Sequence, residues 1–303
     1  MTDTDALEAA ARLLESSDAY RVLRRLQPLD EFGGANGAPL ERAIALDVET
    51  TGTDLAGDAV IELGLVAFDF DPATGHIVRI ADVYDSLEDP GMPIPAETTA
   101  IHGITDAMVV GQRIDDEAVR QFCAGAKWIV AHNAGFDRPF IERRLPIFET
   151  LPWVCSLNEM PWAQEGFSGR KLEYLANRFG FFYEGHRSEI DCRALIEVLR
   201  RPLPKSGAPA WQQVLASGVE ASYRIWALDS PFDTKDLLKA RGYRWDAGKR
   251  CWHRTLDRDA AAAEAPWLKE QVYGGRNREV EIEVQDALTR YSLRPGRVVK
   301  RRL

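Results

Sequence analysis

The chain has 303 residues, 45% of them hydrophobic, and a formal net charge of −9. This length allows one large core and a smaller module, and the composition is ordinary for a globular protein. No apolar run approaches the roughly 18 residues of a membrane span, and the acidic N-terminus is unlike a secretory signal, so neither a membrane partner nor secretion is expected. The four cysteines are widely spaced and form no CxxC pair, which argues against a zinc site or a disulfide framework and predicts a cytoplasmic location.

The first 38 residues are predicted to form a helical extension and a linker. Apolar side chains recur at helical spacing over residues 4–26, which indicates one or two helices. These side chains are Leu7, Ala11, Leu14, Tyr20, Leu23 and Leu26. Residues 30–38 are rich in glycine and are predicted to be a flexible link.

Residues 39–218 are predicted to form one α/β domain. Three strands come first, a fourth strand follows a helix, and further helices complete the domain. The strands are predicted at residues 43–49, 59–68, 77–86 and 127–132, and the helices around Phe140 and at residues 172–179 and 192–199. Residues 201–210 are predicted to be a linker, with residues 211–217 a candidate for the last helix of the domain.

Residues 219–303 are predicted to form a small α+β module. Its elements are predicted to be a strand at residues 224–228, a helix at 234–241, a hairpin made of 243–245 and 250–254, and a helix at 257–269. The short basic tail at residues 294–303 is predicted to be a solvated chain end.

The charge of this module differs from that of the rest of the chain. Residues 221–303 contain 18 Lys and Arg but 12 Asp and Glu, a net charge of +6, and aromatic side chains alternate with cations around the hairpin. Such a surface suits phosphates and bases, although packing of the aromatic rings in a core and an accident of composition remain alternatives. The candidate distal contacts with nucleic acid are Arg244, Trp245, Lys249, Arg250 and Trp252.

Two carboxylates on the first predicted strand of the large domain indicate a metal site. Asp47 and Glu49 are alternate residues, so their side chains point to the same side of the strand. Burying two like charges side by side is costly unless cations neutralise them. Because oxygen-only ligands favour hard divalent ions, we expect Mg²⁺ or Mn²⁺ here, and two ions rather than one.

Three later residues complete a candidate active site, although each has an ordinary structural interpretation by itself. Asp137 precedes a helical pattern and alone would be a helix N-cap. Asp191 fits the first turn of a helix, where carboxylates are common. His186 alone would be a surface loop histidine. It is the ordered set of five residues that predicts chemistry, since an imidazole suits general-base work near neutral pH.

The segments that contain these residues resemble the DEDDh (DnaQ-like) 3'-5' exonucleases, which include polymerase proofreading subunits, oligoribonucleases and repair exonucleases. The shared motifs are D-V-E-T-T-G at residues 47–52, I-H-G-I-T at 101–105, N-A-G-F-D at 133–137 and H-x-x-x-x-D at 186–191. All four occur in the family's order with family-like gaps. The resemblance implies an RNase H-like fold, in which a mixed β-sheet is flanked by helices, and hydrolysis of phosphodiesters with two metal ions.

The resemblance also implies a role for each residue. Asp47, Glu49 and Asp191 match the carboxylates that bind the two metals, with Asp47 bridging them. Asp137 matches the fourth carboxylate, which often acts through a metal-bound water. His186 matches the general base, and the Y-x-x-x-D pattern of the sibling subfamily is not found at this place.

Further residues of the motifs are candidate contacts with the terminal nucleotide. For each of them, turn chemistry, loop packing or core packing is an alternative to substrate binding. These candidates are Thr50, Thr51, Gly52, His102, Ile104, Asn133 and Phe136.

The favoured hypothesis is a metal-dependent 3'-5' exonuclease that releases 5'-mononucleotides from DNA 3' ends in repair or processing. Alternatives are an RNA or oligoribonucleotide exonuclease, a polymerase proofreading subunit and an inactive nucleic-acid-binding scaffold. The extra C-terminal module argues against a minimal oligoribonuclease. No glutamine-led clamp-binding peptide supports a proofreading subunit, and the presence of all five active residues argues against a scaffold.

Overall fold

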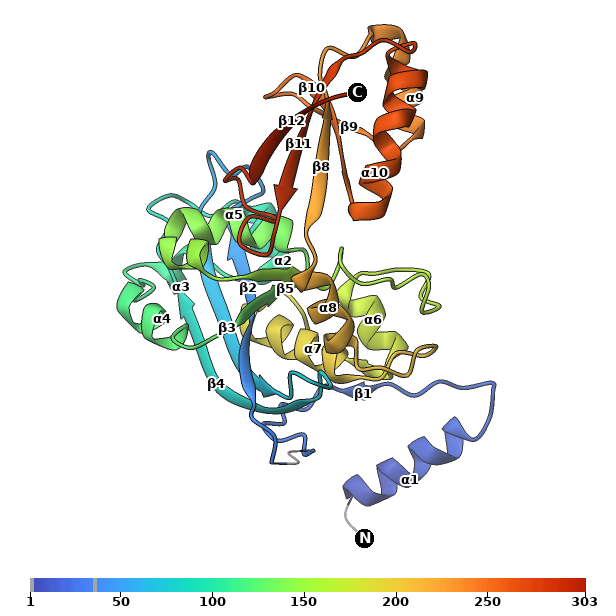
Figure 1. Ribbon diagram of the computed structural model, residues 1–303. Coiled ribbons are helices and arrows are strands. Elements are labelled where there is room, and N and C mark those ends of the chain that lie inside the picture. The colour runs from blue at the N-terminus through green and yellow to red at the C-terminus, as the bar shows by residue number, and fades with distance from the viewer. Residues whose placement is uncertain (1–2, 35–36) are drawn as a thin grey trace.

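The computed structural model describes residues 3–34 and 37–303 and contains two five-stranded β-sheets, one in each lobe of the chain (Figure 1). The sheet of the larger lobe has the strand order β4-β3-β2-β5-β6. β2 pairs antiparallel with β3 and β3 antiparallel with β4, whereas β2, β5 and β6 run parallel. The strands are β2 Glu41–Thr50, β3 Val60–Phe70, β4 Ile77–Leu87, β5 Trp128–Ala131 and β6 Trp153–Cys155.

Helices cover both faces of this sheet, because alternate side chains of its strands are apolar in both directions. Ala43 and Ala45 of β2 pack toward α6, α7 and α8, whereas Ile44 and Leu46 pack toward α4 and α5. These helices are α4 Asp116–Phe122, α5 Ala134–Arg144, α6 Leu172–Arg178, α7 Ser188–Arg200 and α8 Ala210–Val219, and α2 Ala96–His102, α3 Asp106–Val109 and the 3-10 helix Pro146–Thr150 lie in the connections. A mixed sheet flanked in this way confirms the RNase H-like fold that the resemblance implied.

The smaller lobe is an antiparallel sheet with the strand order β12-β11-β8-β10-β9, covered on one face by α9 and α10 (Figure 1). Its elements are β8 Ser222–Ala227, the 3-10 helix Phe232–Thr234, α9 Lys235–Ala240, β9 Arg244–Asp246, β10 Cys251–Leu256, α10 Arg258–Trp267, the π-helical turn Leu268–Val272, β11 Glu279–Gln285 and β12 Arg297–Arg302. The sequence correctly predicted β8, both helices and the β9–β10 hairpin.

The C-terminal tail is exposed to solvent, as predicted, but it forms a strand that was not predicted. Arg297–Arg302 forms β12, which pairs along its whole length with β11, although its side chains are exposed. The strand was not predicted because its sequence is rich in charged residues. Charged side chains are common on exposed edge strands, where they prevent pairing with other chains.

The connection between β11 and β12 returns to the larger lobe and completes its core. Arg138 of α5 is fully buried and pairs with Glu142 at 2.7 Å. Its guanidinium donates to three carbonyl oxygens of that connection, those of Ala287 (3.0 Å), Leu288 (2.5 Å) and Arg290 (2.6 Å). Residues 286–294 therefore fix the small lobe to the helix that carries Asp137.

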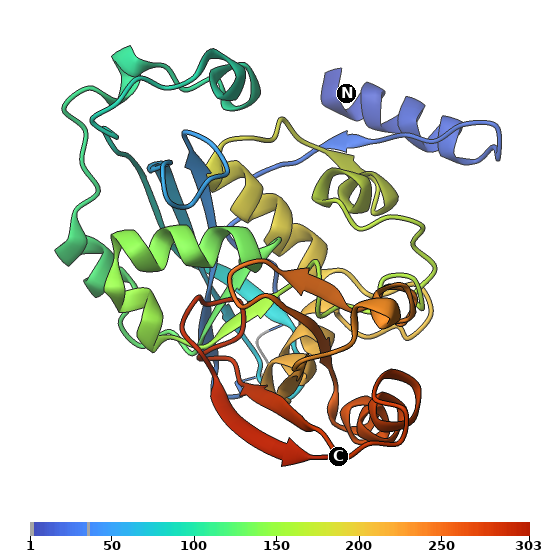
Figure 2. The same cartoon turned by 90° about the horizontal axis from the view of Figure 1, so that it is seen from above.

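The N-terminal extension contains one helix and not two. α1, Asp3–Glu15, projects away from the rest of the chain (Figures 1 and 2). Residues 20–26, for which a helix was possible, are instead extended, and β1, Arg24–Arg25, pairs in parallel with β7, Phe181–Phe182. The apolar residues in this segment have helical spacing, but the backbone instead forms hydrogen bonds with a distant strand. For example, the Leu26 N–H donates to the Phe182 carbonyl at 2.8 Å.

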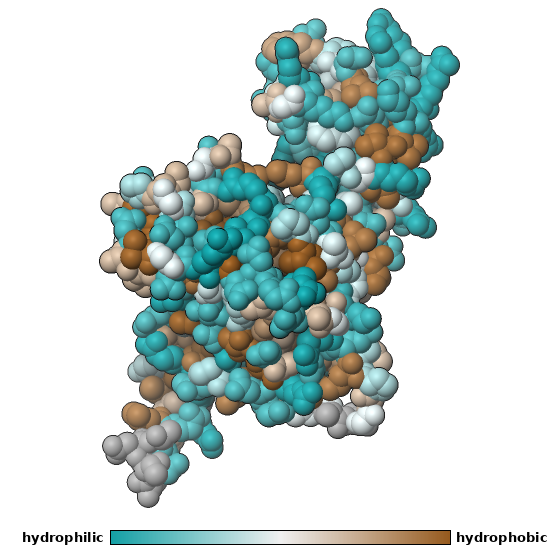
Figure 3. Space-filling model, turned by 90° about the vertical axis from the view of Figure 1, so that its left-hand side faces the viewer, coloured by the Kyte–Doolittle hydropathy of each residue, from teal (hydrophilic) through white to brown (hydrophobic). Residues whose placement is uncertain are grey.

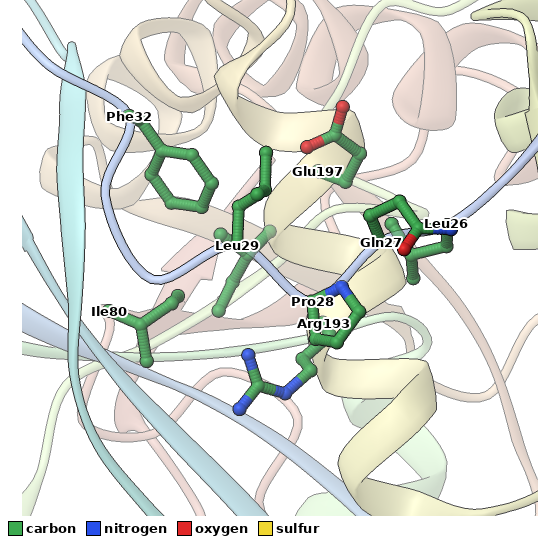
Figure 4. A pocket seen from close by; sticks show the side chains of 9 residues that line it. Leu26, Gln27, Pro28, Leu29, Phe32, Ile80, Arg193 and Glu197 are labelled. Carbon is green, nitrogen blue, oxygen red and sulfur yellow. The ribbon is translucent and has the colours of Figure 1, made fainter. Parts of the chain in front are cut away.

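Part of the segment predicted as a flexible link is anchored. The Ile80 N–H donates to the Asp30 carbonyl, and the Phe32 N–H to the Val78 carbonyl, both at 2.8 Å. Figure 4 shows this segment crossing α7, with Phe32 and Ile80 beside a small pocket. Residues 35–36 of the same segment lie outside the described residues. Within the described residues, no helix combines the length and the hydrophobicity needed to cross a membrane.

Candidate active site

Three carboxylates from two elements meet beside the central strand. Asp47 and Glu49 project from the same face of β2, and Asp191 lies in the first turn of α7, which packs on that face. One oxygen from each of the three groups lies within 4.8 Å of the other two. The spacing predicted from strand alternation is therefore present, with a helix supplying the third oxygen.

Gly64 of β3 allows α7 to approach this closely. It is opposite Asp47 in the strand register. A Cβ at this position would lie 2.5 Å from the carbonyl carbon of Ser188, the first residue of α7, and such a distance is a severe clash. Any larger side chain would push the start of α7, and Asp191 with it, away from β2.

Asp137 lies beside the three clustered carboxylates, and it is not a helix N-cap, which was the ordinary structural alternative for this residue. α5 begins at Ala134, with Asn133 as its N-cap in the left-handed conformation (φ 89°), so Asp137 is in the first turn. Its carboxylate is buried and accepts the Val48 N–H at 3.3 Å. This contact aims the group at the strand segment between Asp47 and Glu49.

Burial and mutual repulsion raise the pKa values of all four carboxyl groups. Loss of hydration, followed by repulsion from Asp191, raises the pKa of Glu49 to about 8. The pKa of Asp137 is raised to about 8 by burial, and those of Asp47 and Asp191 are also raised, with burial again the largest cause. Such a set of oxygen donors suits a hard divalent cation, which would neutralise it.

We expect this electrostatic strain to make the stability of the protein depend on pH and metal together. A carboxyl whose pKa is raised on folding stabilises the fold below its unfolded pKa of about 4. That contribution is lost as pH rises through about 8, the pKa of Glu49. The rise in melting temperature caused by Mn²⁺ should therefore be larger at pH 8.5 than at pH 6. Thermal melts in Mn²⁺ and in chelator would measure this rise at each pH. Glu49→Gln should reduce the difference between the two pH values. An equal rise in melting temperature at both pH values would contradict this account.

His186 lies on an exposed loop that is tied to the carboxylate cluster by its backbone. The residue has a left-handed conformation (φ 68°), and its N–H donates to the Asp191 Oδ2 atom at 2.7 Å. The Arg187 N–H donates to the same oxygen at 3.2 Å. The imidazole is thus held beside the cluster while its ring stays accessible to solvent.

Sequence reasoning missed two residues next to the cluster. The Tyr183 hydroxyl donates to Asp191 Oδ1 at 3.2 Å, and the spacing between these residues matches no motif. Glu62 of β3 is fully buried and binds the side chain of Arg187. A lone carboxylate inside the otherwise apolar strand V-I-E-L-G-L-V-A-F was the available signal for Glu62.

His102 is poised to donate a hydrogen bond from a buried position. Its Nδ1 atom accepts the Ile104 N–H at 3.0 Å, and burial lowers its pKa, so the ring is neutral with its proton on Nε2. That Nε2 atom is buried and has no partner among the described residues. By contrast, the Ile104 side chain packs fully buried against Ile61 and Val109, which favours the loop-packing alternative for this residue.

The hydroxyl groups of Thr50 and Thr51 and the backbone of Gly52 are engaged in the turn at the end of β2. The Thr50 hydroxyl donates to the Gly52 carbonyl at 2.6 Å, and the Thr51 hydroxyl donates to Asp58 at 2.9 Å. A Cβ at Gly52 would lie 2.4 Å from the Asp58 carboxylate. Any contact of these residues with a nucleotide would therefore come mainly from the backbone.

Asn133 and Phe136 line a groove of about 990 Å³ between the two lobes. Phe136 also stacks on Phe140, with ring centroids 5.1 Å apart. The opposite wall is formed by the small lobe, with Arg244 and His253 among its residues. Figure 2 shows β9 and β10 above α5 and α7, and Figure 3 shows the narrowing between the lobes.

The five candidate distal contacts lie on different parts of the small lobe. Arg244 faces the groove, and Lys249 pairs with Glu281 on the same open face of the sheet. Trp245 and Trp252 pack on each other at 5.5 Å on the face that α9 covers. Arg250 is in the hairpin turn with φ 50°. The candidates thus do not form one surface.

An RNase H-like sheet with a carboxylate cluster beside its central strand is typical of metal-dependent phosphodiester hydrolases. The family model described as Exonuclease (RNase_T) matches residues 44–199, just over half of the chain. The chain therefore belongs to this exonuclease family.

Three known proteins that are similar to the chain are two polymerase sequences and one solved structure. The DNA polymerase III subunit epsilon of Treponema pallidum is 34% identical over 163 residues, which cover 51% of this chain and 73% of that protein. The DNA polymerase III PolC-type of Clostridium perfringens is 31% identical over 169 residues, or 52% of this chain and only 11% of that protein. A solved structure of exonuclease X in complex with 5' overhanging duplex DNA is 25% identical, with a TM-score of 0.40, and covers 58% of this chain and 99% of that chain.

Proposed function

We propose that the protein is a 3'-5' exonuclease that releases 5'-mononucleotides from the 3' ends of DNA, in repair or processing. The observation that carries this proposal is the cluster of Asp47, Glu49 and Asp191, with Asp137 beside it, in a chain of the exonuclease family. DNA is favoured over RNA because relatives of the chain are named as DNA polymerase III subunits.

The carboxylates would hold two divalent ions, Mg²⁺ or Mn²⁺. Asp47, Glu49 and Asp191 would be the ligands that hold the ions, and Asp137 would be the fourth carboxylate. Two such ions would supply a nucleophile near neutral pH and stabilise charge on the attacking and leaving oxygens. The protein orients these ligands through the Val48 N–H, the Tyr183 hydroxyl and the backbone of the His186 loop.

His186 is the general base in this proposal. Its exposed ring can reach the attacking water from the solvent side of the cluster, and its backbone bond to Asp191 keeps the loop near the reacting atoms. A base must lie within hydrogen-bond reach of the proton that it removes. The ring takes the proton of the attacking water and passes it to solvent.

The 3'-terminal nucleotide would bind between His102, the turn after β2 and Phe136. The unpartnered Nε2–H of His102 is a donor for a sugar or phosphate oxygen. Asn133 and Phe136 would contact a base in the groove, because stacking on an aromatic ring tolerates any sequence. The strand on the 5' side would then follow the groove to Arg244 of the small lobe.

The proposal is tested with 5'-labelled single-stranded DNA, duplex DNA and RNA incubated side by side with Mn²⁺ or with chelator. We expect stepwise shortening from a free 3'-OH, release of 5'-monophosphates and a higher rate on DNA than on RNA. Equal cleavage of a 3'-phosphorylated or circular substrate would show that the enzyme does not act from that end. A higher rate on RNA would favour the RNA exonuclease alternative.

Arg244 provides a separate test of the groove. Arg244→Ala should raise the KM for single-stranded DNA with little change in kcat, because the contact is with phosphate and lies away from the reacting atoms. The difference from wild type should shrink as salt is raised. Arg276→Ala, which removes an exposed arginine outside the groove lining, is the matched control. The groove assignment fails if both variants have the same KM as wild type at low salt.

A further inference from the structure

A fifth carboxylate, which is itself buried, lies next to the cluster but belongs to none of the motifs. Glu62 is opposite Glu49 in the register of β2 and β3, so both side chains project from the same face of the sheet. Its side chain is fully buried. Unlike the four clustered carboxylates, it has its own cation.

The contacts of Glu62 all lead to the residues that follow His186. Its Oε1 atom accepts a hydrogen bond from Nε of Arg187 at 2.8 Å and forms an ion pair with Nη2 of the same guanidinium at 2.7 Å. Its Oε2 atom accepts the backbone N–H of Ser188 at 3.0 Å, at the start of α7. With both oxygens engaged, Glu62 is not a further metal ligand.

These contacts hold the His186 loop from one side, and Asp191 holds it from the other. The N–H groups of His186 and Arg187 donate to Asp191 Oδ2, while the Arg187 side chain and the Ser188 N–H donate to Glu62. His186 itself has a left-handed conformation that side chains other than glycine rarely adopt. A residue keeps such a backbone conformation only when contacts with the surrounding structure hold it there.

We propose that Glu62 is a positioning residue that holds the imidazole of His186 in place for proton transfer, acting through Arg187 and Ser188. The proposal rests on the function proposed above, since it takes His186 as the general base. A small displacement of a catalytic group has a large effect on rate, roughly 10²-fold for about 1 Å. The buried ion pair also cannot rearrange easily, because an unpaired charge inside the protein is costly.

The first experiment replaces Glu62 by glutamine, which keeps its size but removes the charge that binds Arg187. We expect kcat to fall roughly 10²-fold while the KM for DNA stays the same. Affinity for Mn²⁺ should be unchanged or only slightly lower, because Glu62 is not a ligand, although a negative charge next to Glu49 has been removed. Hydrogen exchange of the amides of residues 186–188 should become faster, which reports on the loop without any activity measurement.

Asp69→Asn is the matched control. Asp69 lies at the other end of the same strand, is also buried, and pairs with Arg42 at 2.9 Å and with Arg79 at 2.8 Å. This substitution removes a buried ion pair of the same kind away from the His186 loop. It should lower the melting temperature without changing kcat at a temperature where the protein is folded, and it should leave amide exchange at residues 186–188 as in wild type.

A double-variant cycle then separates positioning from a general structural role. If Glu62 acts through His186, adding Glu62→Gln to His186→Ala should cause little further loss of kcat. The same fold-loss in both backgrounds, or a wild-type kcat in folded Glu62→Gln, would overturn the proposal. If Glu62→Gln does not fold, Arg187→Lys keeps the charge but not the two-fold contact, and wild-type kcat and amide exchange in that variant would equally overturn it.

The failure of the underlying function would look different. Wild-type protein that degrades neither DNA nor RNA with Mn²⁺ would refute the proposed exonuclease activity and, with it, the role of Glu62 in proton transfer. Faster amide exchange in Glu62→Gln would then show only that Glu62 holds the loop. A wild-type enzyme that is active, combined with an active Glu62→Gln variant, would refute only the positioning proposal.

Discussion

Asp47→Asn is expected to lower kcat by several orders of magnitude while leaving the protein folded. The substitution keeps the size of the side chain but removes the charge of the ligand that both metal ions would share. Stability should not suffer in chelator, because the change also removes a buried carboxyl group whose pKa is raised by burial and by repulsion from Asp137, Asp191 and Glu49. The measurement is the single-turnover rate on 5'-labelled single-stranded DNA at saturating Mn²⁺.

The control for this prediction is Asp18→Asn, which changes an exposed aspartate after α1. It should keep the wild-type rate. The wild-type enzyme should lose its activity in excess chelator and regain it when Mg²⁺ or Mn²⁺ is restored. Substantial activity of Asp47→Asn, or wild-type turnover in chelator, would mean that the cluster does not act through metal ions.

His186→Ala is expected to lower kcat by roughly 10²–10⁴-fold, the usual contribution of a general base. The affinities for Mn²⁺ and for DNA should change little, because the imidazole is exposed and the bond to Asp191 comes from the backbone, which alanine retains. Turnover and metal binding measured on the same preparation would separate these effects.

His76→Ala provides the histidine control for that experiment. His76 lies in the turn between β3 and β4, at the opposite end of the sheet from the cluster, and contacts the Gly33 carbonyl at 3.0 Å. The His76→Ala variant should have the kcat of wild type. If His186→Ala also has the kcat of wild type, His186 is an ordinary surface histidine and another group takes the proton.

The central elements of the fold were predictable because their apolar side chains follow simple periods. β3 is an almost continuous apolar run, β2 contains the apolar run at residues 43–46, and α7 shows a clear apolar face. β11 has an equally clear alternation in E-V-E-I-E-V but was overlooked among charged residues. β1 could not be predicted, because two residues become a strand only through hydrogen bonds to β7, more than 150 positions away.

The candidate site was predictable only as far as its motifs extend. Asp47 and Glu49 were linked by strand alternation, but bringing Asp191 within 4.8 Å required the close approach that Gly64 permits. Glu62 contacts Ser188 from a neighbouring strand, and Tyr183 contacts Asp191 across a loop. Neither contact corresponds to a sequence spacing that could have been recognised in advance. The motifs thus identify the residues of the candidate site itself. The residues that hold them in position are recognised only from the structure.

The burial of Arg138 has a consequence for how the chain is completed during synthesis. Its acceptors in residues 286–294 follow it by 149 to 152 positions. Until that segment leaves the ribosome, the guanidinium has Glu142 but not the three carbonyl oxygens, and each buried donor left without a partner costs about 1–3 kcal/mol. The nuclease core therefore reaches its final stability only after residues 286–294 have been translated, so a nascent chain that stops before residue 286 should remain a target for chaperones and proteases.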